Sequence, residues 1–435
     1  MNDMIKIAGL AVLGIASVHS AQAQMASIDS SKPWSISAAL RGFYDDNYST
    51  GPSHPLNGSA SRKEESFGYE ITPGASLNLQ MEQTTINLGY IYSFRYYEAR
   101  VRNKNDQSHD LHAKLDHVFS PRYKVSASDS FVSAQEPLLL DPQISSAIRS
   151  NGDNIRNTAK ISLNAGITEE LEFVPGYSNT FYDYSDKDQI AGQPSRKALL
   201  NRMEQTFSFD ARYLIQPPTT GVLGYAYGMT DYDKTGNING SVGPVITPDS
   251  RNQTNHRIYA GVDHIFNPKL SASLRAGARI TDYTKVGPTI KDNHTSPYVD
   301  ANLTYAYASG SIVQAGVRLD QGATDIGGLD ATNPVLSADT TAFYVSVSHK
   351  VTEKLTANLL AQYQHSKLQG GVADGLSDDF YTASINLNYQ LTKWLSAEAG
   401  YSYDKLDSQL ESLTVNPQNR DYDRNRVFIG VRATY

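Results

Sequence analysis

The chain has 435 residues, no cysteine, a formal net charge of −7 and a mean hydropathy of −0.43. The absence of cysteine excludes disulfides and thiolate metal sites, and the mild negative charge does not suggest a nucleic-acid partner. A content of 28 tyrosines and 31 glycines against 2 tryptophans is typical of a β-rich protein.

The N-terminal residues have the features of a secretory signal peptide. Lys6 is basic, residues 7–18 form a short apolar run, and Ala21-Gln22-Ala23 is a small-x-small cleavage site. The run is shorter than the about 20 apolar residues of a transmembrane helix; a buried N-terminal helix is the alternative. We expect a signal peptide over residues 1–23, a short periplasmic segment over residues 24–33 and a single domain over residues 34–435.

Polar and apolar residues alternate along most of this domain. Ile86, Leu88, Tyr90, Tyr92, Phe94 and Tyr96 share one parity, and Tyr381, Ala383, Ile385, Leu387 and Tyr389 share another such stripe. A period of two predicts strands with one apolar and one polar face. Strands of a soluble sandwich would show the same period. Long strands with tyrosine at both ends of the apolar stripe favour a lipid-facing band between aromatic girdles.

The strands are joined in hairpins by short polar turns. The clearest pair of turns lies in residues 116–123 and 263–270, and related turns lie in residues 348–355 and 388–395. Turns recur roughly every 40–50 residues, a spacing that propeller blades also show. A blade packs four short strands into that length, whereas here two strands of about a dozen residues and one long loop fill it. A tilted strand that spans a membrane needs about 9–11 residues.

The sequence therefore predicts an all-β fold, a transmembrane antiparallel up-and-down β-barrel of about 18 strands. Both termini then lie on one side with eight short turns, and nine longer loops lie on the other. Pro73-Gly74 and Pro175-Gly176 fall inside strands and predict bulges, because proline cannot donate to the ladder. We expect strands to begin near Trp34, Ser66, Thr84, Asp106, Lys124, Asn154, Glu172, Leu200, Gly221, Arg251, Ser271, His294, Ser311, Ala338, Thr356, Asp378, Ser396 and Tyr422.

The C-terminal strand ends on an aromatic residue that belongs to the apolar parity. The residues that form this pattern, which we expect to act as an assembly signal, are Val427, Ile429, Val431, Ala433 and Tyr435.

With its signal-like N-terminus, its Thr352-Glu353-Lys354-Leu355 and Asn267-Pro268-Lys269-Leu270 turns, its in-strand Pro73-Gly74 and its terminal Tyr435, the chain resembles the outer-membrane β-barrel porin family of Gram-negative bacteria. The resemblance covers nearly all of residues 34–435. It implies a pore in the outer membrane and assembly by the barrel-assembly machinery; some similar barrels occur with exopolysaccharide export systems. In this chain Tyr435 stands where phenylalanine is commoner, and Ala433 where an aromatic residue is common.

The polar parity of the strands carries charges of both signs. These side chains either order a permeating solute or form cross-strand pairs that satisfy one another. The arginines would favour anions if their partners did not neutralise them. The candidates for the pore wall are Arg95, Lys114, Arg212, Arg257, Arg275, Arg279, Arg318, Asp210, Asp263, Asp300, Asp320 and Glu398.

The segment from Gln135 to Asn154 is unusually apolar for an extracellular loop. It predicts either a constriction loop folded into the barrel or a packed cap or oligomer contact. The constriction candidates are Leu138, Leu139, Leu140, Asp141, Ile144 and Ile148.

Chemistry motifs are missing from the sequence: it has no phosphate loop, no G-x-S-x-G and no paired-histidine helix. His117, His264 and His349 occupy a turn position that Tyr213 and Tyr389 share, which indicates an aromatic girdle rather than metal ligands. We expect no enzyme activity, no cofactor and no nucleic-acid partner.

Three functions remain open. A passive porin for small hydrophilic solutes comes first, an exopolysaccharide conduit with a periplasmic partner second, and a structural or adhesive barrel third. The expected location is the outer membrane of a Gram-negative bacterium, reached through a cleaved signal peptide, with outer-membrane lipid and lipopolysaccharide as neighbours. The oligomeric state is left open.

Overall fold

The computed structural model describes residues 32–52, 62–101, 103–135, 153–186, 195–239, 245–285, 292–329, 333–413 and 419–435. The predicted signal peptide and most of the segment over residues 24–33 lie outside this part. The described residues form the strands β1 (Trp34–Asp45), β2 (Ser66–Gln80), β3 (Thr84–Tyr97), β4 (Asn105–Ser120), β5 (Tyr123–Ala134), β6 (Asn154–Gly166), β7 (Leu171–Tyr184), β8 (Arg202–Gln216), β9 (Thr219–Tyr232), β10 (Gln253–Asn267), β11 (Leu270–Tyr283), β12 (Asn293–Ala308), β13 (Ser311–Gly322), β14 (Ser337–Lys350), β15 (Leu355–Gln369), β16 (Ser377–Gln390), β17 (Leu395–Ser408) and β18 (Tyr422–Thr434).

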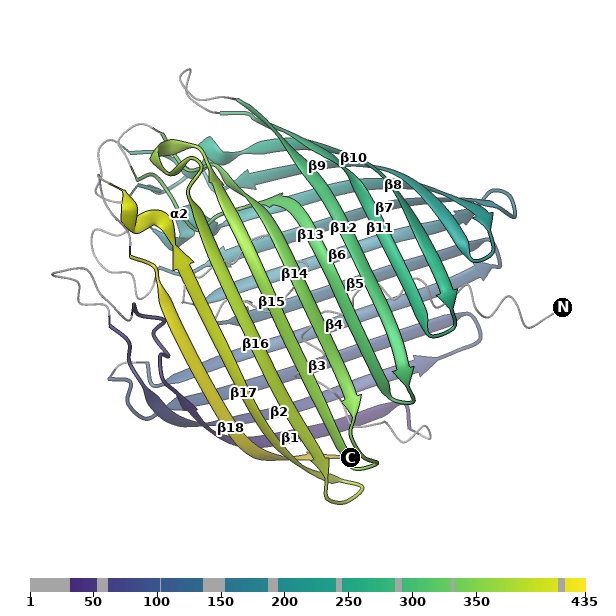
Figure 1. Ribbon diagram of the computed structural model, residues 1–435, viewed down its shortest axis with the longest axis horizontal. Coiled ribbons are helices and arrows are strands. Elements are labelled where there is room, and N and C mark those ends of the chain that lie inside the picture. Colours follow the sequence, from purple (N-terminus) through teal and green to yellow (C-terminus); the bar gives the residue numbers. More distant parts are fainter. Residues whose placement is uncertain are drawn as a thin grey trace.

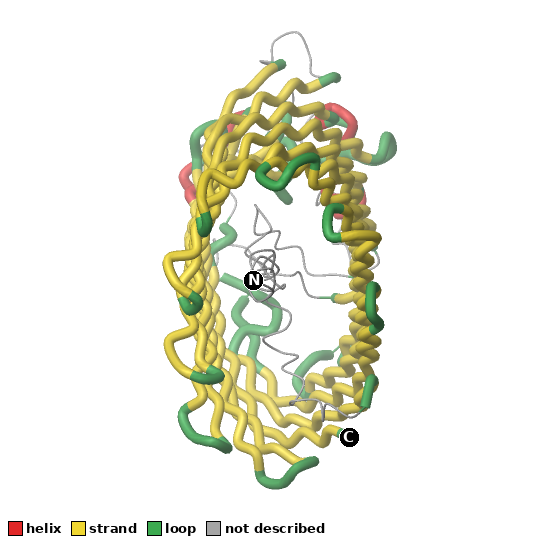
Figure 2. The backbone as a smooth tube through the Cα atoms, turned by 90° about the vertical axis from the view of Figure 1, so that its right-hand side faces the viewer, coloured by secondary structure: helices red, strands yellow, loops and turns green. Residues whose placement is uncertain are grey.

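These strands form one closed antiparallel barrel. Each strand pairs with its neighbours in the sequence, and β1 pairs with β18 to close the ring, with Arg41 opposite Gly430. The predicted fold class and strand count are confirmed, and each strand begins within two residues of its predicted start. The ribbons tilt strongly in Figure 1, and the end-on view of Figure 2 shows an elongated ring with two long, flat walls.

Alternation along each strand creates two unlike faces. On β1 the side chains of Ile36 and Leu40 are exposed, whereas those of Arg41 and Phe43 are buried. Side chains on the concave face of a closed barrel converge and cover one another, and those on the convex face diverge. The buried, charge-bearing parity is therefore the inner face, and the apolar parity is the outer face that meets lipid.

The two ends of the barrel differ in the length of their connections. At one end, here called the short-turn end, eight turns of 2 to 4 residues join the strands; at the other, the long-loop end, nine connections span 7 to 20 residues. Both chain termini of the barrel lie at the short-turn end, where the Tyr435 ring lies 5.8 Å from the Trp34 ring and 5.2 Å from the Trp394 ring. The helices of the described part, such as α2 (Arg196–Leu200), include none long and apolar enough to span a membrane.

The predicted bulges at the two Pro-Gly sequences are wrong. Pro73 pairs in register with Ala38, and the pairing of β2 with β3 resumes at Gly74 without a shift. Pro175 likewise stays in register with Phe209. Loss of one N–H donor leaves a local gap in the ladder but needs no extra residue. Among the described pairings, register shifts occur instead beside short turns, as between Val118 and Ser120.

The three turn histidines lie on the outer face at the short-turn end. His117 Nδ1 lies 2.7 Å from the Thr84 hydroxyl, and His264 Nδ1 lies 2.8 Å from the Thr219 hydroxyl. His349 Nδ1 makes the same contact with Tyr307, at 2.7 Å. His117 and His264 each join a strand to its neighbour, and His349 reaches across β13 to β12. All three rings lie at the edge of the apolar band, in the position of girdle residues.

Candidate pore wall

All twelve predicted wall residues belong to strands of the barrel, and their parity places them on its inner face. Eleven of them form two groups on opposite sides of the ring, and Lys114 on β4 lies apart from both. One group crosses the seam where β1 meets β18, and the other lies on β8 to β13. Whether they line an open channel stays a prediction.

A row of alternating charges crosses the seam. Glu70 on β2 accepts hydrogen bonds from Arg95 (3.0 Å, Nη2–Oε2) and Arg41 (3.3 Å, Nη1–Oε1). Glu398 on β17 pairs with Arg41 at 2.7 Å and with Arg432 at 2.5 Å. The five side chains therefore join β3, β2, β1, β18 and β17 in one chain of ion pairs.

This row was predicted only in part. Arg95 and Glu398 belong to the predicted wall, but Arg41, Glu70 and Arg432 were missed. The signal was present, since Arg41 and Arg432 stand in the polar parity of their strands. Their partners were not visible, because Arg41 and Glu398 lie 357 positions apart.

Glycines on the inner face let long side chains reach past a neighbouring strand. Gly430 on β18 lies opposite Arg41 on one side and Glu398 on the other, so these two side chains meet above it. A Cβ at Gly430 would lie 2.7 Å from Arg41 Cγ. In the same way Gly224 separates Asp210 from Tyr259, whose hydroxyl donates to Asp210 Oδ1 at 2.5 Å.

The second group is centred on two carboxylates. Asp320, on β13, lies 2.9 Å from Arg257, 3.1 Å from Arg279 and 3.5 Å from Arg318. Asp263, on β10, pairs with Arg212 at 2.9 Å and with Arg275 at 2.8 Å. Every arginine of this group therefore has an acidic partner within 3.5 Å.

Three further carboxylates complete the charge balance on this wall. Asp300 lies in register with Arg275 on one side and Arg318 on the other, and Glu172 pairs with Arg212 at 3.3 Å. With Asp210, Asp263 and Asp320, five carboxylates face five arginines, so the local net charge is zero. The arginines would favour anions only if they lacked acidic partners, and each of them has one. The charges on this wall therefore form cross-strand pairs that satisfy one another.

Lys114 lies on another part of the inner face, on β4. Its Nζ lies 3.1 Å from Asp116, which also pairs with Lys124 at 3.2 Å. The side chains of both lysines remain more than two-fifths exposed, against 17% for Asp116. Among the predicted wall residues that form ion pairs, Lys114 has the most exposed side chain.

At the long-loop end, the connection between β13 and β14 packs over other loops. Ile326, Leu329 and Val335 from this connection join a buried cluster with Leu368 and Leu410 from β15 and the β17–β18 connection. On the other side, Gly328 donates its N–H to Ile238 in the β9–β10 connection, at 3.0 Å. This segment thus links loops from both sides of the barrel mouth.

Two arginines hold the same segment in place. Arg251 is fully buried and donates to the carbonyl oxygens of Leu199, Thr324 and Ile326 at 3.0–3.2 Å. Arg420 donates to both oxygens of Asp325 at 2.8 Å. Burial by itself lowers the pKa of Arg420, but Asp325 and Asp378 outweigh it and raise that pKa, so the guanidinium stays charged.

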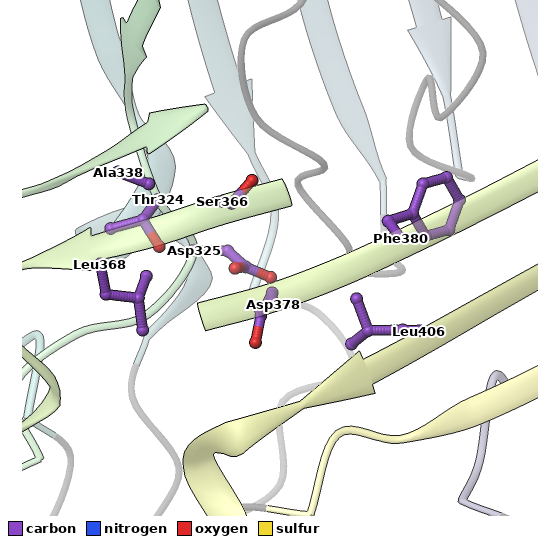
Figure 3. Close-up of a pocket in the computed structure, with 8 residues that line it drawn as sticks. All are labelled: Thr324, Asp325, Ala338, Ser366, Leu368, Asp378, Phe380 and Leu406. Atoms are coloured by element: carbon purple, nitrogen blue, oxygen red, sulfur yellow. The ribbon is translucent and has the colours of Figure 1, made fainter. Parts of the chain in front are cut away.

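The pocket beside Asp325 is too small for a solute. It holds about 10 Å³, roughly one water molecule. Figure 3 shows Asp325 and Asp378 beside each other in it, with Leu368, Phe380 and Leu406 around them. The predicted constriction residues Leu138, Leu139, Leu140, Asp141, Ile144 and Ile148 lie outside the described residues. The packing of residues 323–329 and 333–336 against neighbouring loops was missed, although Ile326, Leu329 and Leu336 give this segment an apolar character.

A closed up-and-down barrel with a lipid-facing apolar band and an ion-paired polar interior is an outer-membrane β-barrel of the porin class. The family model described as "Putative beta-barrel porin 2" matches residues 37–435, so the chain belongs to that family. No curated protein matches the sequence.

Solved structures with a similar barrel include OccK2 (OpdF) of Pseudomonas aeruginosa, at 12% identity and a TM-score of 0.44, covering 92% of this chain and 98% of that one. A BenF-like porin of Pseudomonas fluorescens Pf-5 has 11% identity and a TM-score of 0.44, with 92% and 99% covered. The FrpB iron transporter of Neisseria meningitidis has 10% identity and a TM-score of 0.44, with 93% and 82% covered. Likeness at this level carries no argument about a solute.

Proposed function

We propose that the protein is a passive porin, a water-filled pore through which small hydrophilic solutes cross the outer membrane. The observation that carries the proposal is the ion-paired inner wall of a closed 18-strand barrel, in a chain of a porin family. Barrels of this size leave an aqueous channel unless a loop or plug fills it. The polysaccharide conduit gains no support from the described residues or from the family, and we do not propose it.

The charge balance of the wall sets the expected selectivity. Five arginines face five carboxylates on β7 to β13, and the seam row has three arginines against two glutamates. Alternating fixed charges give a solute no strong net field. We therefore expect weak selectivity by charge and stronger selectivity by size, with residues 323–329 and 333–336 narrowing the long-loop end.

The route to the membrane is part of the proposal. Residues 1–23 direct export and are cleaved, the short-turn end faces the periplasm, and the C-terminal strand with Tyr435 is recognised by the barrel-assembly machinery. The pattern at Val427, Ile429, Val431 and Ala433 lies on the outer face beside β1 and β17, where the barrel closes.

Cysteine accessibility tests the open lumen directly, because the chain has no native cysteine. Asn302 and Leu303 are neighbours on β12 that face inward and outward; Asn302 donates to Ser273 Oγ at 2.7 Å, whereas Leu303 is exposed on the outer face. A membrane-impermeant charged thiol reagent should label Asn302→Cys in proteoliposomes. It should leave the matched control Leu303→Cys unlabelled, because lipid covers it.

The same preparation should swell in solutions of small neutral sugars. Modification of Asn302→Cys should slow the swelling, since the attached group projects into the lumen. If the reagent did not label Asn302→Cys and the proteoliposomes did not swell, the lumen would be blocked and the porin proposal would be wrong.

A further inference from the structure

The outer face of the barrel is not uniformly apolar. Asp129 on β5 has the same parity as Phe131 and lies opposite Ala113 on β4. The neighbouring strands β4 and β6 expose Leu111 and Ile161 on this same face. The Asp129 carboxylate is therefore on the lipid side of the wall. It accepts two hydrogen bonds, at 3.1 and 3.2 Å, both from the amide of Asn157 on β6.

The depth of Asp129 makes this position unusual. A tilted strand advances about 2.5 Å along the membrane normal per residue, from a step of about 3.3 Å and a tilt of about 40°. Six residues separate Asp129 from Tyr123 at the short-turn end, which places it about 15 Å into an apolar band about 25 Å tall. A carboxylate at this depth lies inside hydrocarbon.

On other strands, the outward residues at this depth carry no charge. Asp129 is the fourth outward residue of β5 counted from the short-turn end. On β16 the first outward charge is Asp379, the sixth such residue, and on β11 it is Asp282, the seventh. On β3 no outward residue of the strand is charged.

Uncharged polar side chains extend the same region. Asn179 on β7 lies between Tyr177 and Phe181 on the outer face, in register with Gln205 on β8. Asp129, Asn157, Asn179 and Gln205 define what we call the polar flank. It spans the outer face of β5 to β8, where these four residues are, in that order, the fourth, fifth, fifth and sixth outward residues of their strands counted from the short-turn end.

A charged group facing lipid near the midplane costs several kcal/mol in general, and polar groups at membrane depth usually face protein or water. We propose that the polar flank is an interface between copies of this chain, so that the protein is a homo-oligomer in the membrane. The proposal rests on the barrel spanning a membrane, and it does not depend on conduction.

The chemistry of the flank suits a second copy. A symmetric interface must be complementary to itself or to an adjoining patch of the same surface. Asp129 offers acceptors, and the amides of Asn157, Asn179 and Gln205 offer both donors and acceptors, so equal patches can satisfy each other. The polar flank together with the adjoining outer face of β4 covers about 30 Å by 25 Å, or about 750 Å², close to the about 800 Å² per partner of a standard interface.

The shape of the barrel supports the same docking. β4 to β7 belong to the more distant wall in Figure 1, and Figure 2 shows that the long walls of the ring are flat. A flat wall can bring a broad area of two barrels together, which the curved ends of the ring cannot.

The first test is the mass of the full protein extracted from membranes in mild detergent, measured by light scattering with the detergent subtracted. We expect a multiple of the protomer mass. A single protomer mass would overturn the proposal.

Substitution separates the polar flank from the rest of the outer face. The double variant Asp129→Leu/Asn179→Leu should fold, remain heat-modifiable and shift to the mass of one protomer, because its flank now suits lipid. The control Asp282→Leu, an outward charge at the rim of β11, should keep the oligomer. A double variant that stays oligomeric would contradict the proposal.

Cross-linking tests the interface even if that variant fails to fold, and it identifies the chain that contacts the polar flank. Asn179→Cys should form a thiol cross-link at twice the protomer mass in native membranes, and Leu387→Cys on β16 should not. A cross-link to a chain of another mass, equal cross-linking at both positions or none at Asn179→Cys would each overturn the proposal. None of these outcomes would alter the labelling expected at Asn302→Cys, so the porin proposal is tested separately.

Discussion

Arg41 on β1 reaches Glu398 on β17 across the whole width of β18, with 2.7 Å between Nη2 and Oε2. The contact passes over Gly430, which lies opposite both residues. Both side chains are less than one-tenth exposed. The C-terminal strand of the ring is thus held from inside by residues of the first strand and the penultimate one.

Filling the space above Gly430 should weaken this seam. A Cβ there would lie 2.3 Å from the Leu40 carbonyl oxygen and 2.7 Å from Arg41 Cγ, so Gly430→Val should displace Arg41 from Glu398. Breaking a buried ion pair costs about 3–5 kcal/mol in general. We expect a clear drop in the temperature at which the folded band converts on a gel. Gly42→Ala is the matched control, since its Cβ meets nothing within 4 Å, and an equal drop in both variants would refute the account of the seam.

Removing Tyr435 should impair assembly more than any change in the long loops. Its backbone N–H donates to the Ile36 carbonyl at 2.8 Å and its carbonyl accepts from the Ile36 N–H at 2.9 Å, while its ring packs between Trp34 and Trp394. Without it the closing edge leaves backbone groups unpaired near lipid. The amount of heat-modifiable barrel in the outer membrane measures the effect, and unchanged amounts would show that the terminal residue is not needed.

A charge should be costly on the outer face and tolerated on the inner one. Leu387 on β16 is exposed on the outer face, and its neighbour Asn386 faces inward opposite Gly400. Leu387→Arg should cost about 2–4 kcal/mol near the midplane, whereas Asn386→Arg should fold almost normally. Chemical unfolding in lipid vesicles measures both. Equal destabilisation would mean that the faces of β16 are assigned the wrong way round.

Neutralising arginines and neutralising a carboxylate of this wall should shift ion selectivity in opposite directions. Arg275→Gln together with Arg279→Gln leaves Asp263 and Asp320 with less positive charge nearby and should shift the reversal potential towards cations. Asp320→Asn leaves Arg257, Arg279 and Arg318 without their shared carboxylate and should shift it towards anions. Reversal potentials in a salt gradient give the sign, and shifts of the same sign in both variants would show that this wall does not face the ion path.

The sequence predicted the barrel well because the signal is local. A period of two sets the face of each residue within its own strand, and short turns mark where strands end, so all 18 strands begin within two residues of their predicted starts. The same parity placed residues such as Arg279 and Glu398 on the inner face.

Which inner-face side chains pair with one another could not be predicted from the pattern within each strand. The three arginines that meet at Asp320 come from three strands, so their pairing depends on the stagger between strands. The contact of Arg41 with Glu398 depends on the glycine at position 430 between them. Neither property appears in a single strand. The bulges expected at Pro73 and Pro175 failed for a related reason, since a ladder paired on both sides tolerates one missing donor without losing register.

The most direct measurement of the central claim is single-channel conductance of the purified barrel in a planar bilayer. The account predicts discrete, ohmic conductance steps. Deletion of residues 138–148, the predicted constriction loop, should raise their size. A barrel that stays electrically silent, both intact and without that loop, would contradict the porin function.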